Sequence, residues 1–272
     1  ENGCSGGTGR GYEINPTRPG DYKIGKTPPN ISTVVRTPLV PKADEKVMIS
    51  AKIIDFDGSV ASAKFYYSNN LTDTYDKFTE VVMTLKMGTT DTYEAEIPGR
   101  PENSIVRYYL FATDDIGQES YMPFSANSPN NPDFIFYTVR NGGLTISDIQ
   151  RVLNVANDAS PFENQEVTVT GVVTASAKAY DLEQIYIQDP NATMWAGIKC
   201  QGNSDLIKLF RGQEVTVTGT VAESFGYTVL NVTNVVKTGE VISVPVATLD
   251  PSDSAFYFSK NAEAYESMLV GL

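Results

Sequence analysis

Two short acidic segments contain the residues of this chain with the most specific metal-binding chemistry. Asp55 and Asp57 flank a phenylalanine just before Gly58, and Asp114 and Asp115 are adjacent. Carboxylates on the loops of β-domains supply the oxygen ligands that calcium prefers, so these four aspartates are candidate calcium ligands. The alternative explanation is that aspartate and glycine simply form turns. The complete spacing of an EF-hand loop is not present in either segment.

A second group combines aromatic and polar side chains in two strand-like segments. The isoleucines within residues 184–188 point inward by alternation, which turns Tyr186 and Gln188 outward. The same reasoning turns Trp195 and Lys199 outward on the next strand. Aromatic rings beside an amide and a lysine are what the stacking of bases or sugars requires. The predicted ligand-binding residues are therefore Tyr186, Gln188, Trp195 and Lys199, joined by Tyr180, Phe225 and Tyr227 from adjoining loops or strand ends. The alternative is that these aromatics pack under a leading helix, the preceding domain or a partner.

One residue type on which much hydrolytic chemistry depends is missing. Histidine is absent from the 272 residues, which excludes Ser–His–Asp and Cys–His nucleophile systems and most zinc sites. Cys4 and Cys200 lie too far apart in sequence to form a metal knuckle. A nuclease would need a clustered metal-binding carboxylate set with a general base, and no such spacing is apparent. The sequence therefore predicts no catalytic residue and no enzyme.

The charge of the chain limits its partners. Its net charge is −12, and residues 144–272 contain seven basic and fifteen acidic side chains. Nucleic-acid binding depends largely on lysine and arginine at phosphates, so any such binding is expected to be weak and strongly salt-sensitive. No apolar run approaches the roughly 18–20 residues needed to cross a bilayer, so no membrane-spanning segment is predicted.

The first half of the chain has the pattern of an antiparallel sandwich. Residues 1–29 are rich in glycine, proline, threonine and asparagine and are predicted to form a flexible leader or tether. Residues 30–140 contain six or seven short strand-like runs separated by turn signals, one of them spanning residues 78–87. Such a succession of strands predicts an all-β domain built from two packed sheets.

The second half contains a heptapeptide that occurs twice. QEVTVTG stands at residues 165–171 and again at 213–219, and its valines alternate with threonines. The copies are too close for two domains, so they are predicted to be two strands of one small barrel spanning residues 144–250. The run after residue 144 has helical spacing, and Ser147 is its expected N-cap. Residues 204–210 are predicted to form a short helix between the third and fourth strands.

Both halves resemble known families. AKIIDFDGSV, YEAEIP and VRYYLFATDDIG are similar to segments of bacterial Ig-like and fibronectin type III-like domains. GQEVTVTG, IYIQDPNATMWAGIKC and EAYESMLVGL resemble the OB-fold module of secreted bacterial nucleases and surface lipoproteins. The resemblance implies an Ig-like antiparallel β-sandwich followed by a five-stranded OB-fold barrel with one leading helix. Ser267 stands where such proteins usually have glycine, and the catalytic domain that commonly follows this module is not among the 272 residues given.

The resemblance implies a bacterial protein that is secreted or lies at the cell surface, lipid-anchored through a segment outside this chain. Residues 251–272 are expected to continue into a longer protein. The predicted function is that of a noncatalytic binding module whose OB-fold binds single-stranded nucleic acid weakly. The alternative is a structural or adhesion protein whose domains bind glycans or surface proteins.

Overall fold

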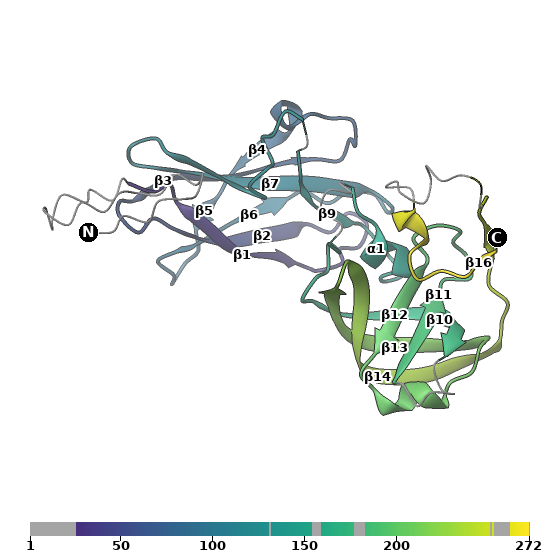
Figure 1. Ribbon diagram of the computed structural model, residues 1–272. Helices are drawn as coiled ribbons and strands as arrows, with labels where there is room; N and C mark the ends of the chain where they lie inside the picture. The colour runs from purple at the N-terminus through teal and green to yellow at the C-terminus, as the bar shows by residue number, and fades with distance from the viewer. Residues whose placement is uncertain are drawn as a thin grey trace, which may run out of the picture.

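The computed structural model describes residues 26–130, 132–153, 159–176, 183–250, 252 and 262–271, and these form an all-β protein. Figure 1 shows two bodies along the chain, an N-terminal half in purple to teal and a green C-terminal half. Cys4 and Tyr180 lie outside the described residues. Among the residues placed by the structure, no helix has the length and apolar character needed to cross a membrane.

The N-terminal half consists of two sheets whose strands all pair antiparallel. The first sheet has the order β1-β2-β6-β5, formed by Asn30–Thr37, Val47–Ile54, Thr92–Ile97 and Thr84–Leu85. The second has the order β4-β3-β7-β8, formed by Thr79–Val82, Val60–Ser68, Ile105–Asp114 and Glu119–Met122, and β9 (Ile135–Thr138) also pairs with β7. One apolar cluster joins the two sheets, and Ile49, Phe65 and Leu110 are completely buried in it.

The prediction of one strand over residues 78–87 is wrong, because that run is divided between the two sheets. Its first part is β4, which pairs with β3, and its second part is β5, which pairs with β6. Met83 lies between them, is buried, and donates its backbone N–H to the Ala63 carbonyl at 2.9 Å. The chain therefore crosses from one sheet to the other at a core residue.

The C-terminal half is a closed barrel with the strand order β10-β11-β12-β14-β13. The five strands are Glu166–Ser176, Gln184–Gln188, Gly197–Gln201, Tyr227–Val241 and Gln213–Ser224 in that order. β12 and β14 pair in parallel, and the other neighbours pair antiparallel. The short helix η3 (Ser204–Lys208) connects β12 to β13, as the sequence predicts.

The two copies of the heptapeptide are direct neighbours in this barrel. In the antiparallel pairing of β10 with β13, Val169 lies opposite Val217, and both valines are buried. On the other face the Thr168 and Thr218 hydroxyls share a hydrogen bond at 2.8 Å. A Cβ atom on Gly219 would lie 2.4 Å from the Asn231 carbonyl oxygen, so this glycine is needed where β14 approaches closely. The repeat thus builds one apolar and one hydroxyl-bonded face from the same segment.

The helix that leads into the barrel is shorter than the pattern suggests. Within the described residues α1 spans Ile146–Gln150, and residues 154–157 of the predicted run lie outside them. The predicted cap, Ser147, is wrong: Thr145 is the N-cap, and it forms a capping box with Asp148. Ile146 is completely buried against the barrel core.

The two halves contact each other through charged and aromatic side chains. Arg140, at the end of the N-terminal half, forms an ion pair with the buried Asp148 of α1 at 2.8 Å. The Arg36 guanidinium lies over the rings of Tyr137 in the sandwich and Phe162 before the barrel, 5.1 and 5.5 Å from their centroids. Because each arginine joins groups from both halves, the barrel is held against one end of the sandwich.

Candidate functional site

The barrel face formed by β11 and β12 is partly as predicted. The isoleucines of β11, Ile185 and Ile187, are completely buried in the barrel core, which confirms their inward orientation. Tyr186 and Lys199 lie opposite each other in the antiparallel pairing of these strands, and both are half-buried. The two residues thus occupy neighbouring positions of the sheet, and their role in binding stays a prediction.

Gln188 departs from the expected outward orientation, because its side chain is completely buried. The amide Nε2 donates to the Pro245 carbonyl at 2.8 Å, and Oε1 accepts the backbone N–H of Leu269 at 2.9 Å. Both ends of the amide are therefore used to hold later parts of the chain. The expectation that this amide faces a ligand is wrong for this arrangement.

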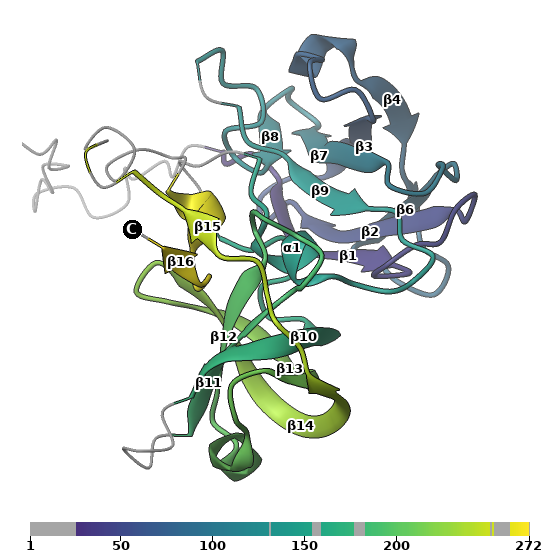
Figure 2. The same cartoon turned by 90° about the vertical axis from the view of Figure 1, so that its right-hand side faces the viewer.

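The covering element is residues 262–271, which we call the C-terminal segment. Figure 2 shows it in yellow beside α1 and the end of the barrel, with its last strand β16 (Val270–Gly271) paired in parallel to β15 (Ala247–Thr248). A Cβ atom on Gly197 would lie 2.3 Å from the Ser267 carbonyl oxygen. The space beside Gly197, where a ligand ring could otherwise approach the strand, is therefore taken by the chain itself.

Trp195 lies before β12 and not on it, so the expectation that strand alternation turns it outward is wrong. Its backbone is instead bonded to the C-terminal segment. Its backbone has a positive φ of 57°, and its N–H donates to the Ala264 carbonyl at 2.6 Å. The indole side chain is half-buried. The element bonded to Trp195 is the C-terminal segment, which is none of the three covers that the alternative named: a leading helix, the preceding domain or a partner.

The most exposed of the predicted aromatic residues lie at the tip of the β13–β14 hairpin. Phe225 is fully exposed and Tyr227 is 56% exposed. Phe225 and Gly226 both have positive φ, at 55° and 80°, which is the backbone of a tight type I′ turn. This turn places the two rings at the projecting tip of the hairpin. Tyr180, which stands between β10 and β11 in the sequence, lies outside the described residues.

Glu266 joins the C-terminal segment to the barrel and to α1. Its Oε1 accepts the backbone N–H of Thr228 at 3.2 Å and the Gln150 amide at 3.4 Å. Burial, reinforced by the nearby charges of Glu263 and Glu223, raises the pKa of Glu266 to about 7. The sequence pattern does not mark this residue, because its neighbours come from distant parts of the chain.

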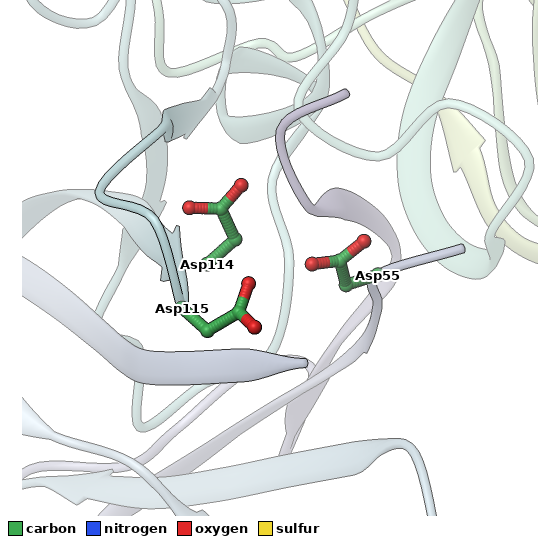
Figure 3. A group of neighbouring side chains, drawn as sticks. All are labelled: Asp55, Asp114 and Asp115. Atoms are coloured by element: carbon green, nitrogen blue, oxygen red, sulfur yellow. The ribbon is translucent and has the colours of Figure 1, made fainter. Parts of the chain in front are cut away.

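Three of the four predicted metal ligands meet at one end of the sandwich. Asp55 follows β2, Asp114 ends β7 and Asp115 begins the next turn, and one carboxylate oxygen from each lies within 4.8 Å of the others. Figure 3 shows these three carboxylates reaching toward a common space. Asp57 is not in the group: its Oδ2 accepts the backbone N–H of Thr27 at 3.0 Å.

Nucleophilic chemistry finds little support in the barrel. The Cys200 thiol is completely buried in the core, and burial raises its pKa, so it stays protonated and shielded from substrates.

No protein-family model and no curated protein matches the chain.

Proposed function

We propose that this chain is a noncatalytic binding module of a secreted or cell-surface bacterial protein, in which an Ig-like sandwich carries an OB-fold barrel. The strand order of the barrel, in which the fifth strand lies between the third and the fourth, supports the OB-fold assignment. So do the parallel pairing of β12 with β14 and the short helix η3 before β13. Barrels of this class bind oligonucleotides or oligosaccharides rather than transforming them.

The observation that carries the proposal is the exposed aromatic pair on the β13–β14 hairpin. This hairpin joins the fourth and fifth strands, and the corresponding loop of OB-folds contacts the ligand. Phe225 has its whole ring in solvent, and the turn fixes its backbone. A base stacked on such a ring contributes about 1–3 kcal/mol without regard to sequence. We therefore propose weak, sequence-tolerant binding of single-stranded nucleic acid at this tip.

The second candidate is a structural or adhesion role in which the same tip contacts a glycan or a surface protein. Two observations favour it. The barrel half has fifteen acidic and seven basic side chains, which opposes polyanions. The β11–β12 face, which OB-folds also use, is covered around Gln188 and Gly197 by the C-terminal segment. A sugar ring can stack on Phe225 without any positive charge nearby.

The two candidates are separated by titrating the whole chain into a fluorescently labelled single-stranded oligonucleotide at low and physiological salt. Anisotropy should show saturable binding that weakens with salt. Phe225→Ser should reduce the affinity roughly 5- to 150-fold, the equivalent of one lost stacking contact. Phe210→Ser is the matched control, because Phe210 is 55% exposed but lies before β13, away from the tip.

An absence of binding at low salt would exclude the nucleic-acid form of the proposal. Equal affinities of the wild type and Phe225→Ser would exclude the tip as its site. Glycan-array binding that is lost in Phe225→Ser but kept in Phe210→Ser would support the second candidate instead.

A further inference from the structure

We propose that Asp55, Asp114 and Asp115 bind one calcium ion at the end of the sandwich where β2 and β7 finish. The spacing is the first argument. One carboxylate oxygen from each residue lies within 4.8 Å of the others. Calcium contacts oxygen at about 2.3–2.6 Å, so oxygens up to about 5 Å apart can share one ion. This site lies in the other half of the chain from the barrel, so it does not depend on the ligand proposed for the barrel.

The second argument is an unpaired carboxylate oxygen that is buried. Asp114 is only 3% exposed. Its Oδ1 accepts the backbone N–H groups of Ile116 and Gln118 at 3.0 and 2.7 Å, which fixes the carboxylate. Its Oδ2 is buried without a hydrogen-bond partner. A buried anionic oxygen without a partner is costly, and a bound cation would remove that cost.

Asp55 is arranged in the same way. Its Oδ1 accepts the backbone N–H of Asp57 at 3.0 Å, and its Oδ2 is buried without a partner. In both residues one oxygen therefore holds the local turn, and the other is left for something outside the protein's own hydrogen bonds. Turn formation alone, the alternative explanation of these aspartates, accounts for the first oxygen of each and not for the second.

The local charge also favours a cation. Three carboxylates within one ion's reach repel each other. Lys26 pairs with Asp115 at 3.6 Å, but both side chains are almost half exposed, so water screens much of that attraction. One screened lysine does not balance three acidic groups. A divalent ion among them would offset the repulsion directly.

The position of the cluster indicates what the ion would do. Asp55 follows β2 of the first sheet, and Asp114 ends β7 of the second, so one ion would join the two sheets at their ends. A Cβ atom on Gly58 would lie 2.7 Å from Asp55 Oδ2 and 2.8 Å from Asp115 Oδ1. The loop thus packs directly against carboxylate oxygens of two residues of the cluster. An all-oxygen set on loops fits calcium better than zinc, which prefers imidazole and thiolate.

The test uses the whole chain after treatment with a chelator. Calcium chloride is titrated in by calorimetry, and thermal unfolding is followed with calcium or magnesium at matched ionic strength. We expect one calcium per chain with a Kd of about 0.1–1 mM, as in extracellular modules. The midpoint of unfolding should rise by about 3–10 °C at ~10 mM calcium, and by less with magnesium.

The variant D55N/D115N should lose the calcium response. Asp57→Asn is the matched control, because Asp57 is in the same loop but outside the cluster, and it should keep the response. If the double variant does not fold, the single variant Asp115→Asn is measured, because its side chain is exposed and should tolerate the change. The proposal is overturned by no binding up to ~10 mM, by equal stabilisation with magnesium, or by an unchanged affinity in Asp115→Asn.

Discussion

Thr228 and Glu266 are joined by a hydrogen bond from the backbone N–H of Thr228 to the Glu266 Oε1 at 3.2 Å. This contact ties the C-terminal segment to β14, the last strand of the barrel. The same oxygen accepts the Gln150 amide at 3.4 Å, which adds α1 to the junction. One half-buried carboxyl group therefore links three elements, and its protonation state affects all of them.

Attachment of the C-terminal segment should depend on pH through Glu266. The pKa of Glu266 is about 7 in the folded chain and 4.5 in its ordinary state. The folded chain therefore keeps a proton that the unfolded chain releases between these values. The stabilisation is fully present below about pH 4.5 and is lost as the pH rises through about 7. Hydrogen exchange of residues 262–271 should accordingly be slower at pH 5.5 than at pH 8, after correction for the intrinsic rate.

Glu266→Gln separates this effect from other titrations. Glutamine keeps an acceptor oxygen for Thr228 and Gln150 but has no charge to bury, so the variant should show similar protection at both pH values. Glu96→Gln is the control, because Glu96 forms an exposed ion pair with Lys46 in the sandwich. An equal pH dependence in the wild type and Glu266→Gln would show that this carboxyl group is not responsible.

Removal of the Gln188 amide should release the C-terminal segment. Gln188→Ala deletes the acceptor of the Leu269 N–H and the donor to the Pro245 carbonyl. Each buried group left without a partner lowers the free energy of unfolding by about 1–3 kcal/mol, and by less where water can reach it. Limited proteolysis should therefore cut the variant within residues 262–271 faster than the wild type. Gln184→Ala, on the same strand but half-buried, should behave like the wild type; equal cleavage of both variants would contradict the anchoring role.

Gly197 should tolerate no side chain while the C-terminal segment is in place. A Cβ atom there would lie 2.3 Å from the Ser267 carbonyl oxygen, and that neighbour is backbone and cannot rotate away. Gly197→Ala should therefore displace the segment, lower the unfolding midpoint and shift the emission of Trp195 to longer wavelength as its surroundings become wetter. Gly142→Ala is the control, because its Cβ would meet nothing within 4 Å. An unchanged emission spectrum in Gly197→Ala would mean that the segment does not occupy this face in solution.

The alternating patterns of the barrel could be predicted because they depend only on local chemistry. Valine and threonine alternate in both copies of the heptapeptide, and the structure buries Val169 and Val217 as expected. The burial of Gln188 could not be predicted in this way, because the covering residues lie about 80 positions later in the chain. A strand's pattern shows which residues share a face, but it does not show what later covers that face.

The residues that make up the acidic cluster could likewise be predicted only in part from the sequence. In sequence, Asp55 and Asp57 are equivalent candidates within one short loop. In the structure the Asp57 N–H bonds to Asp55 Oδ1, and Asp57 instead accepts the Thr27 N–H, so the two carboxylates face different partners. Asp114 joins Asp55 only because β2 and β7 end beside each other in different sheets. Such a meeting between sheets is a property of the tertiary fold that residue spacing does not report.

The paired repeat offers a direct test of the barrel's two faces. Val217 is completely buried, so Val217→Ala should lower the free energy of unfolding by at least about 1.5 kcal/mol, from two lost methyl groups and the cavity they leave. Its neighbour Thr218 shares only a hydroxyl hydrogen bond with Thr168 on the outer face, so Thr218→Ala should cost no more than about 0.5–1 kcal/mol. Urea unfolding followed by Trp195 fluorescence measures both, because the indole lies in the same barrel. A larger loss for Thr218→Ala than for Val217→Ala would mean that the strand presents its other face to the core, since a shift of one residue in register exchanges the two faces.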